Sequence, residues 1–160
     1  MIDGHTTTTS HLTPVDDQNS GVERTCAKLC IHSFRLSPEE MTESLGLSPT
    51  KIVRARLAEA KYTDRPNGWF LSSEGKVSSS DLRTHLDWLL SLVLPKKDAL
   101  LDLQRVDGLK MLVRCPWWSN GNDGPVLWPE QMKGLSELNL ECDFDFKDYR
   151  EDPIESDRGI

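Results

Sequence analysis

The segment TCAKLCIHSFRLSPEEMTESLG (Thr25–Gly46) places a strand pattern directly before the start of a helix. In its first half, apolar Ala27, Leu29 and Ile31 occupy every second position. The positions between them are held by Cys26, Lys28, Cys30 and His32. Because successive side chains of a strand point to opposite faces, this period of two indicates a half-buried strand. We predict a strand over residues 25–34.

The second half of the segment carries the signals of a helix start and a helix end. Ser37 precedes Pro38 and lies three residues before Glu40. In that spacing the Ser and Glu side chains can each satisfy a backbone donor at the first turn, and Pro is favoured at the first helical position. Gly46 supplies a residue that adopts the left-handed conformation at a helix end. We predict a helix over residues 37–46.

The remaining chain alternates the same two patterns. Further strands are predicted over 51–57, 69–73, 109–115 and 139–146, although residues 55–61 also suit a helix. Further helices are predicted over 81–94 and 129–137, with a second amphipathic stretch between Pro95 and Gly108. The order is βαββαβ followed by αβ, and its first six elements match the ferredoxin-like order. We therefore expect an α+β two-layer sandwich with helices on one face of a mainly antiparallel sheet.

The length of 160 residues fits a single domain. Residues 1–24 are rich in Thr, Ser, Asp and Gly and carry little apolar surface to offset the entropy of ordering. We interpret 1–24 as a flexible leader, 25–149 as one α+β domain and 150–160 as a flexible tail.

The charge balance is acidic, with 19 Lys and Arg against 26 Asp and Glu and a net charge of −7. Such a balance opposes nucleic-acid binding and repels anionic membranes, so we expect neither partner. A basic protein partner is easier to accommodate. The sequence shows no signal-peptide pattern and no apolar run of about 18 residues, and its four cysteines are typical of reduced thiols. We expect a cytoplasmic protein.

The free face of the predicted sheet would carry charges of both signs. Lys28, Lys110 and Arg114 come from two strands, and Glu141, Asp143 and Asp145 come from a third. A solvated face with charge pairs between neighbouring strands explains this pattern most simply. The alternative is a binding surface for a charged partner.

No constellation of catalytic or metal-binding residues is evident. Cys26, Cys30 and His32 share one strand face, but Cys115 and Cys142 fall on the apolar faces of their strands, so the four thiols cannot converge on a metal. His85 lies within an apolar helix stripe, and neither a Gly-x-Ser-x-Gly elbow nor a P-loop is present. We predict no cofactor and no enzyme activity. The remaining enzyme hypothesis uses the dispersed carboxylates Asp64, Asp143 and Asp145.

Three tryptophans bracket a Gly- and Asn-rich loop, and aromatic residues beside loops often anchor protein interfaces. The simpler alternative is that these rings cover the end of the sheet. The predicted binding residues are those of the loop and of the last strand: Trp117, Trp118, Asn120, Asp123, Trp128, Glu141, Asp143 and Asp145.

Several stretches together resemble domain-of-unknown-function family 4279, an uncharacterised and mainly bacterial family. The resembling stretches are 27–31, 36–50, 68–73, 82–90 and 135–146, including the run Leu45-Gly-Leu-Ser-Pro49. The resemblance covers nearly all of 25–149. It supports the fold and the cellular setting, and the family offers no established catalytic residues to carry over.

Two non-enzymatic functions fit these observations. The first is a protein-binding domain of the immunity or inhibitor type, which neutralises a basic toxin or effector; acidic residues would speed the encounter. The alternative is a regulatory domain that binds a small molecule or peptide through the loop 117–128. The sequence leaves the oligomeric state open.

Overall fold

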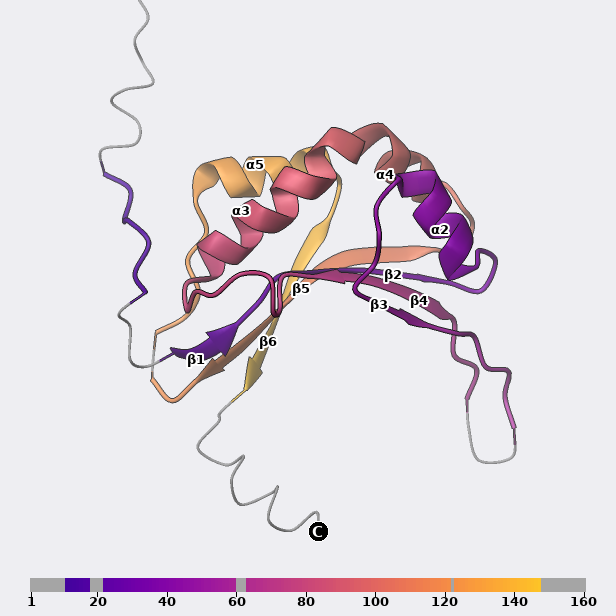
Figure 1. The fold of residues 1–160 in the computed structure, drawn as a ribbon, viewed down its shortest axis with the longest axis horizontal. Helices are drawn as coiled ribbons and strands as arrows, with labels where there is room; N and C mark the ends of the chain where they lie inside the picture. Colours follow the sequence, from indigo (N-terminus) through magenta and orange to yellow (C-terminus); the bar gives the residue numbers. More distant parts are fainter. Residues whose placement is uncertain (1–10, 18–21, 60–62, 122, 148–160) are drawn as a thin grey trace, which may run out of the picture.

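The computed structural model describes residues 11–17, 22–59, 63–121 and 123–147. A sheet forms one layer and the helices form the other, all on the same side (Figure 1). The strands are β1 (Val22–Thr25), β2 (Lys28–Ser33), β3 (Lys51–Val53), β4 (Asn67–Ser72), β5 (Lys110–Ser119) and β6 (Glu141–Lys147). The helices are α2 (Pro38–Leu45), α3 (Leu82–Val93), α4 (Lys97–Leu103) and α5 (Pro129–Glu137), and the 3₁₀ turn η1 (Leu94–Lys96) joins α3 to α4. The predicted α+β two-layer sandwich is confirmed.

The sheet has the ferredoxin-like strand order with one strand added at each end of the sequence. β2 lies between β4 and β5, and β3 lies outside β4. The connections β2-α2-β3 and β4-α3-β5 therefore each skip one strand, as the split βαβ arrangement requires. All of these neighbours are antiparallel. The helix α5 then returns the chain to β6, which runs parallel to β5 on its other edge.

The predicted strand 25–34 is divided into two. β1 pairs with the second half of β5 and β2 pairs with its first half, with a register shift inside β1. The long strand β5 thus serves as the common partner of three strands, and it continues past Pro116 to Ser119. The predicted leader was therefore too long, because β1 begins at Val22 and residues 13–17 also contact the domain. Residues 1–10, 18–21 and 148–160, including the predicted tail, lie outside the described residues.

The strand predicted over 51–57 ends at Val53, and the helical alternative for 55–61 was wrong for residues 55–59. Instead the chain forms an arm between β3 and β4, closed by reciprocal backbone hydrogen bonds between Arg56 and Arg65 of 2.8 and 2.7 Å. Side chains also link the two sides of this arm. The Arg65 guanidinium donates to the Arg54 carbonyl at 2.9 Å, and the Ala55 amide donates to the Asn67 side chain at 2.8 Å. These contacts join residues about ten positions apart, so the spacing of apolar residues along the sequence gives no sign of them.

Helix α2 has the boundaries and caps that the sequence predicts. The Ser37 hydroxyl accepts from the Glu40 amide at 3.1 Å, and the Ser37 amide donates to the Glu40 carboxylate at 3.3 Å. Gly46 adopts φ +66° and its amide donates to the Thr42 carbonyl at 2.8 Å. Trp69 of β4 anchors the helix on the sheet by donating its indole hydrogen to the Thr42 hydroxyl at 2.9 Å.

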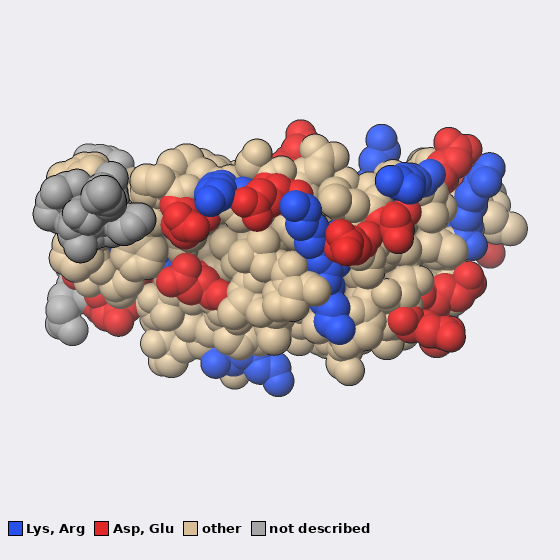
Figure 2. Space-filling view, turned by 90° about the horizontal axis from the view of Figure 1, so that it is seen from above, with Lys and Arg blue, Asp and Glu red and all other residues tan. Residues whose placement is uncertain are grey.

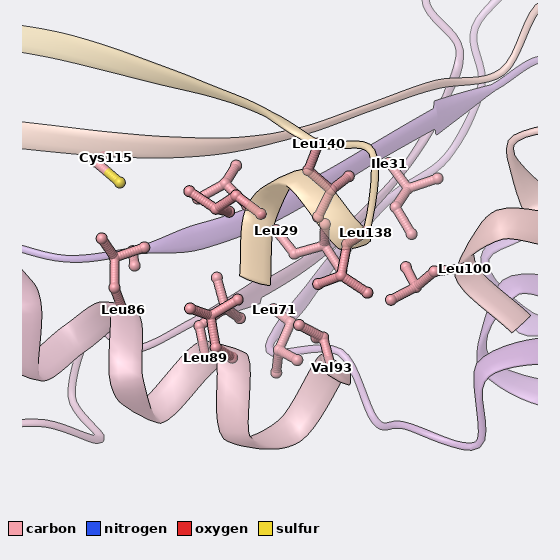
Figure 3. Packing of buried hydrophobic residues seen from close by; sticks show 14 of the residues in the cluster. Leu29, Ile31, Leu71, Leu86, Leu89, Val93, Leu100, Cys115, Leu138 and Leu140 are labelled. Carbon is pink, nitrogen blue, oxygen red and sulfur yellow. The ribbon is translucent and has the colours of Figure 1, made fainter. Parts of the chain in front are cut away.

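One apolar core fills the space between the two layers. Leu29 and Ile31 of β2 face Leu86, Leu89 and Val93 of α3, and all five are fully buried (Figure 3). Within the described residues no helix has the length and apolar character needed to cross a bilayer. The outer side of the helix layer carries acidic and basic side chains interspersed (Figure 2), so it presents no field of a single sign.

Candidate binding surface on the open face of the sheet

The sheet face opposite the helices carries charged side chains of both signs. Strand alternation places Lys28 of β2 beside Arg114 of β5, and His32 beside Lys110, on this face. Arg24 of β1 and Lys51 of β3 extend the basic group, and β6 adds the carboxylates Glu141, Asp143 and Asp145 along one edge. The predicted arrangement of charges on this face agrees with the strand register.

Two of the predicted β6 carboxylates are paired with cations. Arg114 Nε donates to Asp143 Oδ2 at 2.9 Å, and a terminal nitrogen of the same guanidinium lies 2.8 Å from Oδ2 in an ion pair. Lys147 Nζ lies 3.2 Å from Asp145 Oδ2. These side chains are roughly half exposed, so each pair contributes at most about 1 kcal/mol to stability. The β6 edge is therefore a charge-paired ladder, and the pair between Arg114 and Asp143 is of the kind that the sequence predicts between neighbouring strands of a solvated face.

Apolar side chains occupy the centre of the same face. Phe70 of β4 and Leu112 of β5 are partly exposed and flank Cys30 of β2, which is buried between them. The His32 ring meets Phe70 edge-on at 5.4 Å between centroids, and Lys28 Nζ lies 5.8 Å from the Phe70 ring centroid. A central apolar area with aromatic rings and flanking charges is the composition of protein-binding surfaces.

Two pockets adjoin Glu74, which follows β4. One pocket of about 480 Å³ is lined by Arg24, Trp118 and the serines 78–80, and the Arg24 guanidinium stacks 3.9 Å from the Trp118 ring centroid. A second pocket of about 380 Å³ lies between Lys28, Lys51 and Phe70. Both pockets offer charged and hydroxyl groups beside an aromatic wall, the mixture that orients a polar ligand or a partner side chain.

The three loop tryptophans do not meet at one site. Trp117 enters the core and its indole donates to the Asp123 carbonyl at 3.3 Å. Trp118 lies on the open face, whereas Trp128 begins α5 in the helix layer and donates to the Thr13 carbonyl at 3.0 Å. Asn120 and Asp123 are exposed in the loop. Trp117 and Trp118 thus lie on opposite sheet faces, because consecutive residues of a strand point to opposite faces. The role of the loop residues in binding stays a prediction.

The thiols divide between the two sheet faces as the alternation predicts. Cys115 Sγ lies 3.8 Å from Cys142 Sγ on the helix side, while Cys26 and Cys30 lie on the open side. Burial raises the pKa of Cys26 and Cys30, which makes both poor nucleophiles. Among the described residues, no three His, Cys, Asp or Glu side chains are placed to hold a metal ion. Asp64, in the arm between β3 and β4, is separated from Asp143 and Asp145 by the width of the sheet.

A buried Ser–His pair links α3 to the sheet. His85 Nδ1 accepts from the Ser73 hydroxyl at 2.7 Å, and His85 Nε2 donates to the Ser79 carbonyl at 2.8 Å. The Ser73 oxygen in turn accepts from the Ala27 amide at 2.9 Å. Burial lowers the pKa of His85, although the Ser79 carbonyl and the charges of Asp17 and Asp81 oppose this shift. Because Ser73 is fully buried, the pair holds the fold together and offers no exposed nucleophile.

Comparison with known families supports the resemblance seen in the sequence. A family model described as Domain of unknown function (DUF4279) matches residues 23–149, which is well over half of the chain. No curated protein and no solved structure matches significantly. The matched range includes every strand of the sheet except the first residue of β1, so the open face belongs to the family domain.

Proposed function

We propose a protein-binding function for this chain, which belongs to the DUF4279 family of domains of unknown function. The domain acts without catalysis, as an immunity or inhibitor protein that covers and neutralises a basic toxin or effector. The partner is bound by the open face of the sheet. We place the protein in the cytoplasm, in keeping with its four free thiols.

The observation that carries this proposal is a sheet face left uncovered by the helices, with Phe70 and Leu112 at its centre. Apolar side chains gathered on an uncovered face cost free energy in water and are stabilised when a partner removes them from it. Around them lie basic side chains of β1, β2, β3 and β5 and carboxylates of β6, two of which are paired with cations. A protein surface can match such a pattern with complementary charges. A phosphate backbone would be repelled by the β6 carboxylates, so a protein is the better partner.

Most of the excess negative charge lies outside residues 22–147. Residues 22–147 contain 17 Lys and Arg against 18 Asp and Glu, and are therefore nearly balanced. Residues 1–21 contain three acids and no base, and residues 148–160 contain five acids and two bases. The second segment follows directly on β6, the strand that carries Glu141, Asp143 and Asp145 on the open face. The carboxylates of both segments would attract a basic partner at long range, which raises the rate of association.

The proposal can be tested with the protein encoded next to this one, since inhibitors and their targets must be made together. The measurement is the dissociation constant of the full chain for that protein by calorimetry. We expect Leu112→Glu to weaken binding at least ten-fold, because a carboxylate would enter the apolar centre of the interface. The matched control is Met132→Glu, an exposed apolar residue on α5, for which we expect less than a two-fold change.

Equal binding by both variants would show that the open face is not the contact surface. Failure of the wild-type chain to bind the neighbouring product would contradict the immunity-type function itself. The other hypothesis, a ligand site in the loop 117–128, receives less support from the geometry because Trp118 lies on the open face of the sheet, whereas Trp117 and Trp128 lie on its helix side.

A further inference from the structure

A buried ion pair stands at the start of α3, where the side chains of Asp81 and Arg83 are only 8% and 4% exposed. Asp81 Oδ1 accepts from both the Arg83 amide and Arg83 Nε at 3.0 Å, and Asp81 Oδ2 accepts from a terminal guanidinium nitrogen at 2.7 Å. Burial by itself would raise the pKa of Asp81, but the hydrogen bonds from Arg83 and the Asp16 amide outweigh it and keep the pKa below its ordinary value. The pair is therefore charged in the folded protein.

The remaining donors of Arg83 are taken up by a segment that the sequence places in the leader. One terminal nitrogen donates to the Thr13 carbonyl at 2.6 Å and to the Thr13 hydroxyl at 2.8 Å, and the other donates to the Pro14 carbonyl at 2.8 Å. A guanidinium has five N–H donors, and these bonds together with those to Asp81 use all of them. The segment 13–16 thus completes the coordination of a buried charge.

Two further contacts hold the same segment in place. Trp128 donates its indole hydrogen to the Thr13 carbonyl at 3.0 Å, and the Asp16 amide donates to Asp81 Oδ2 at 2.8 Å. The Arg83 guanidinium also lies 5.0 Å from the Trp128 ring centroid. Most of these contacts reach backbone atoms of the segment, so the groove formed by Asp81, Arg83 and Trp128 holds it mainly through its backbone.

The family model covers the residues that form the groove but not the segment that occupies it. Asp81, Arg83 and Trp128 lie within the matched range 23–149, whereas residues 13–16 precede it. A pocket of about 580 Å³ also continues beside the segment, toward Trp117 and Val126. Ser80 lines this pocket, and its hydroxyl oxygen is shielded from water with no hydrogen-bond partner. The groove therefore belongs to the domain and is larger than the segment that it holds.

We propose that the groove formed by Asp81, Arg83 and Trp128 is a peptide-binding site, occupied by the chain's own residues 13–16. It accepts a segment that presents two successive carbonyls to Arg83 and an amide to Asp81. An equivalent segment of a partner protein binds there when it displaces residues 13–16. This site lies at the start of two helices, Leu82–Val93 and Pro129–Glu137, and does not depend on the open face of the sheet.

The test uses the full chain and a fluorescein-labelled peptide with the sequence of residues 11–17. Thr13→Val removes the hydroxyl that accepts from Arg83, and Asp16→Pro removes the amide that donates to Asp81. We expect the double variant Thr13→Val/Asp16→Pro to bind the peptide at least ten-fold more tightly than the wild type, because a tethered occupant competes at millimolar effective concentration. Fluorescence anisotropy measures this difference.

Two controls make the result specific. A His11→Ala chain, changed at an exposed side chain outside residues 13–16, should bind the peptide as weakly as the wild type. A peptide carrying the Val and Pro changes should bind the double variant at least ten-fold more weakly than the natural peptide.

Either of two results would overturn the proposal. One is equal affinity of the double variant for both peptides, including no binding of either. The other is fast hydrogen exchange at the Asp16 amide of the wild-type chain, because an amide bound to Asp81 is protected.

Discussion

At the scale of single residues, His85 shows how a polar group is tolerated in the core. Both ring nitrogens are satisfied, one by a hydroxyl and one by a carbonyl. A carbonyl only accepts, so Nε2 carries the hydrogen and Nδ1 accepts from Ser73. A second proton on Nδ1 would remove the acceptor of the Ser73 hydroxyl and place a charge in the core. The neutral ring is therefore the form that the fold selects.

Because the fold requires a neutral His85, we predict that the protein loses stability at mildly acidic pH. The folded pKa of His85 lies below the ordinary value of 6.5, so the unfolded chain binds more protons than the folded chain between the two values. The contribution of His85 is complete above about pH 6.5 and is lost as the pH falls toward the folded pKa. We expect the free energy of unfolding in urea to decrease between pH 7.5 and 5.5, and His85→Gln to reduce that decrease.

The matched control for this experiment is His11→Gln, at an exposed residue of the N-terminal segment. The control should keep the wild-type dependence on pH. If His85→Gln and the wild type lost stability in parallel over this range, the titration of His85 would not be the cause.

At the scale of elements, α2 is short, so its caps carry a large share of its local stability. Ser37→Ala removes the oxygen that accepts from the Glu40 amide, and we expect it to lower the free energy of unfolding by about 1 kcal/mol. Ser44→Ala makes the same chemical change at an exposed interior position of the helix and should have little effect. Urea denaturation of both variants measures the difference; equal losses would mean that the cap is not used in solution.

The elements that the sequence predicts well are those whose signals are local. The cap at Ser37, the end at Gly46 and the alternation in β2 each depend on residues a few positions apart. The division between β1 and β2 depends instead on their shared partner β5, about 90 residues away. The docking of Thr13 depends on Arg83, 70 positions along the chain. Neither contact has a local signature, which is why the leader was predicted as flexible.

In the candidate site too, some features follow from local sequence patterns and others depend on distant contacts. Alternation alone placed Lys28, Arg114 and the β6 carboxylates on one face, and the register confirms that placement. The pairing of Arg114 with Asp143 requires β6 to lie beside β5, which is set by the connection through α5. The separation of Trp117 from Trp118 also follows from alternation, once β5 extends past Pro116. The predicted strand ended at residue 115, so the two rings were assigned to one loop.

At the scale of the whole molecule, the helices and the sheet share a single core. Leu89 of α3 and Leu71 of β4 lie in the cluster that also contains Leu138 and Leu140 before β6 (Figure 3). Elements that bury their apolar faces against each other gain this stabilisation only when both are folded. We therefore expect one cooperative unfolding transition for residues 22–147, reported identically by far-ultraviolet circular dichroism and tryptophan fluorescence.

Leu89→Ala tests this shared core because the side chain is fully buried between the two layers. The change should lower the free energy of unfolding by about 2–5 kcal/mol through lost burial and the cavity that remains. Leu57→Ala deletes the same atoms from a residue that is 76% exposed in the arm between β3 and β4, and should change stability by less than about 0.5 kcal/mol. Loss of the helical signal before the tryptophan signal in Leu89→Ala would show that the layers unfold separately, and the core would then not be one unit.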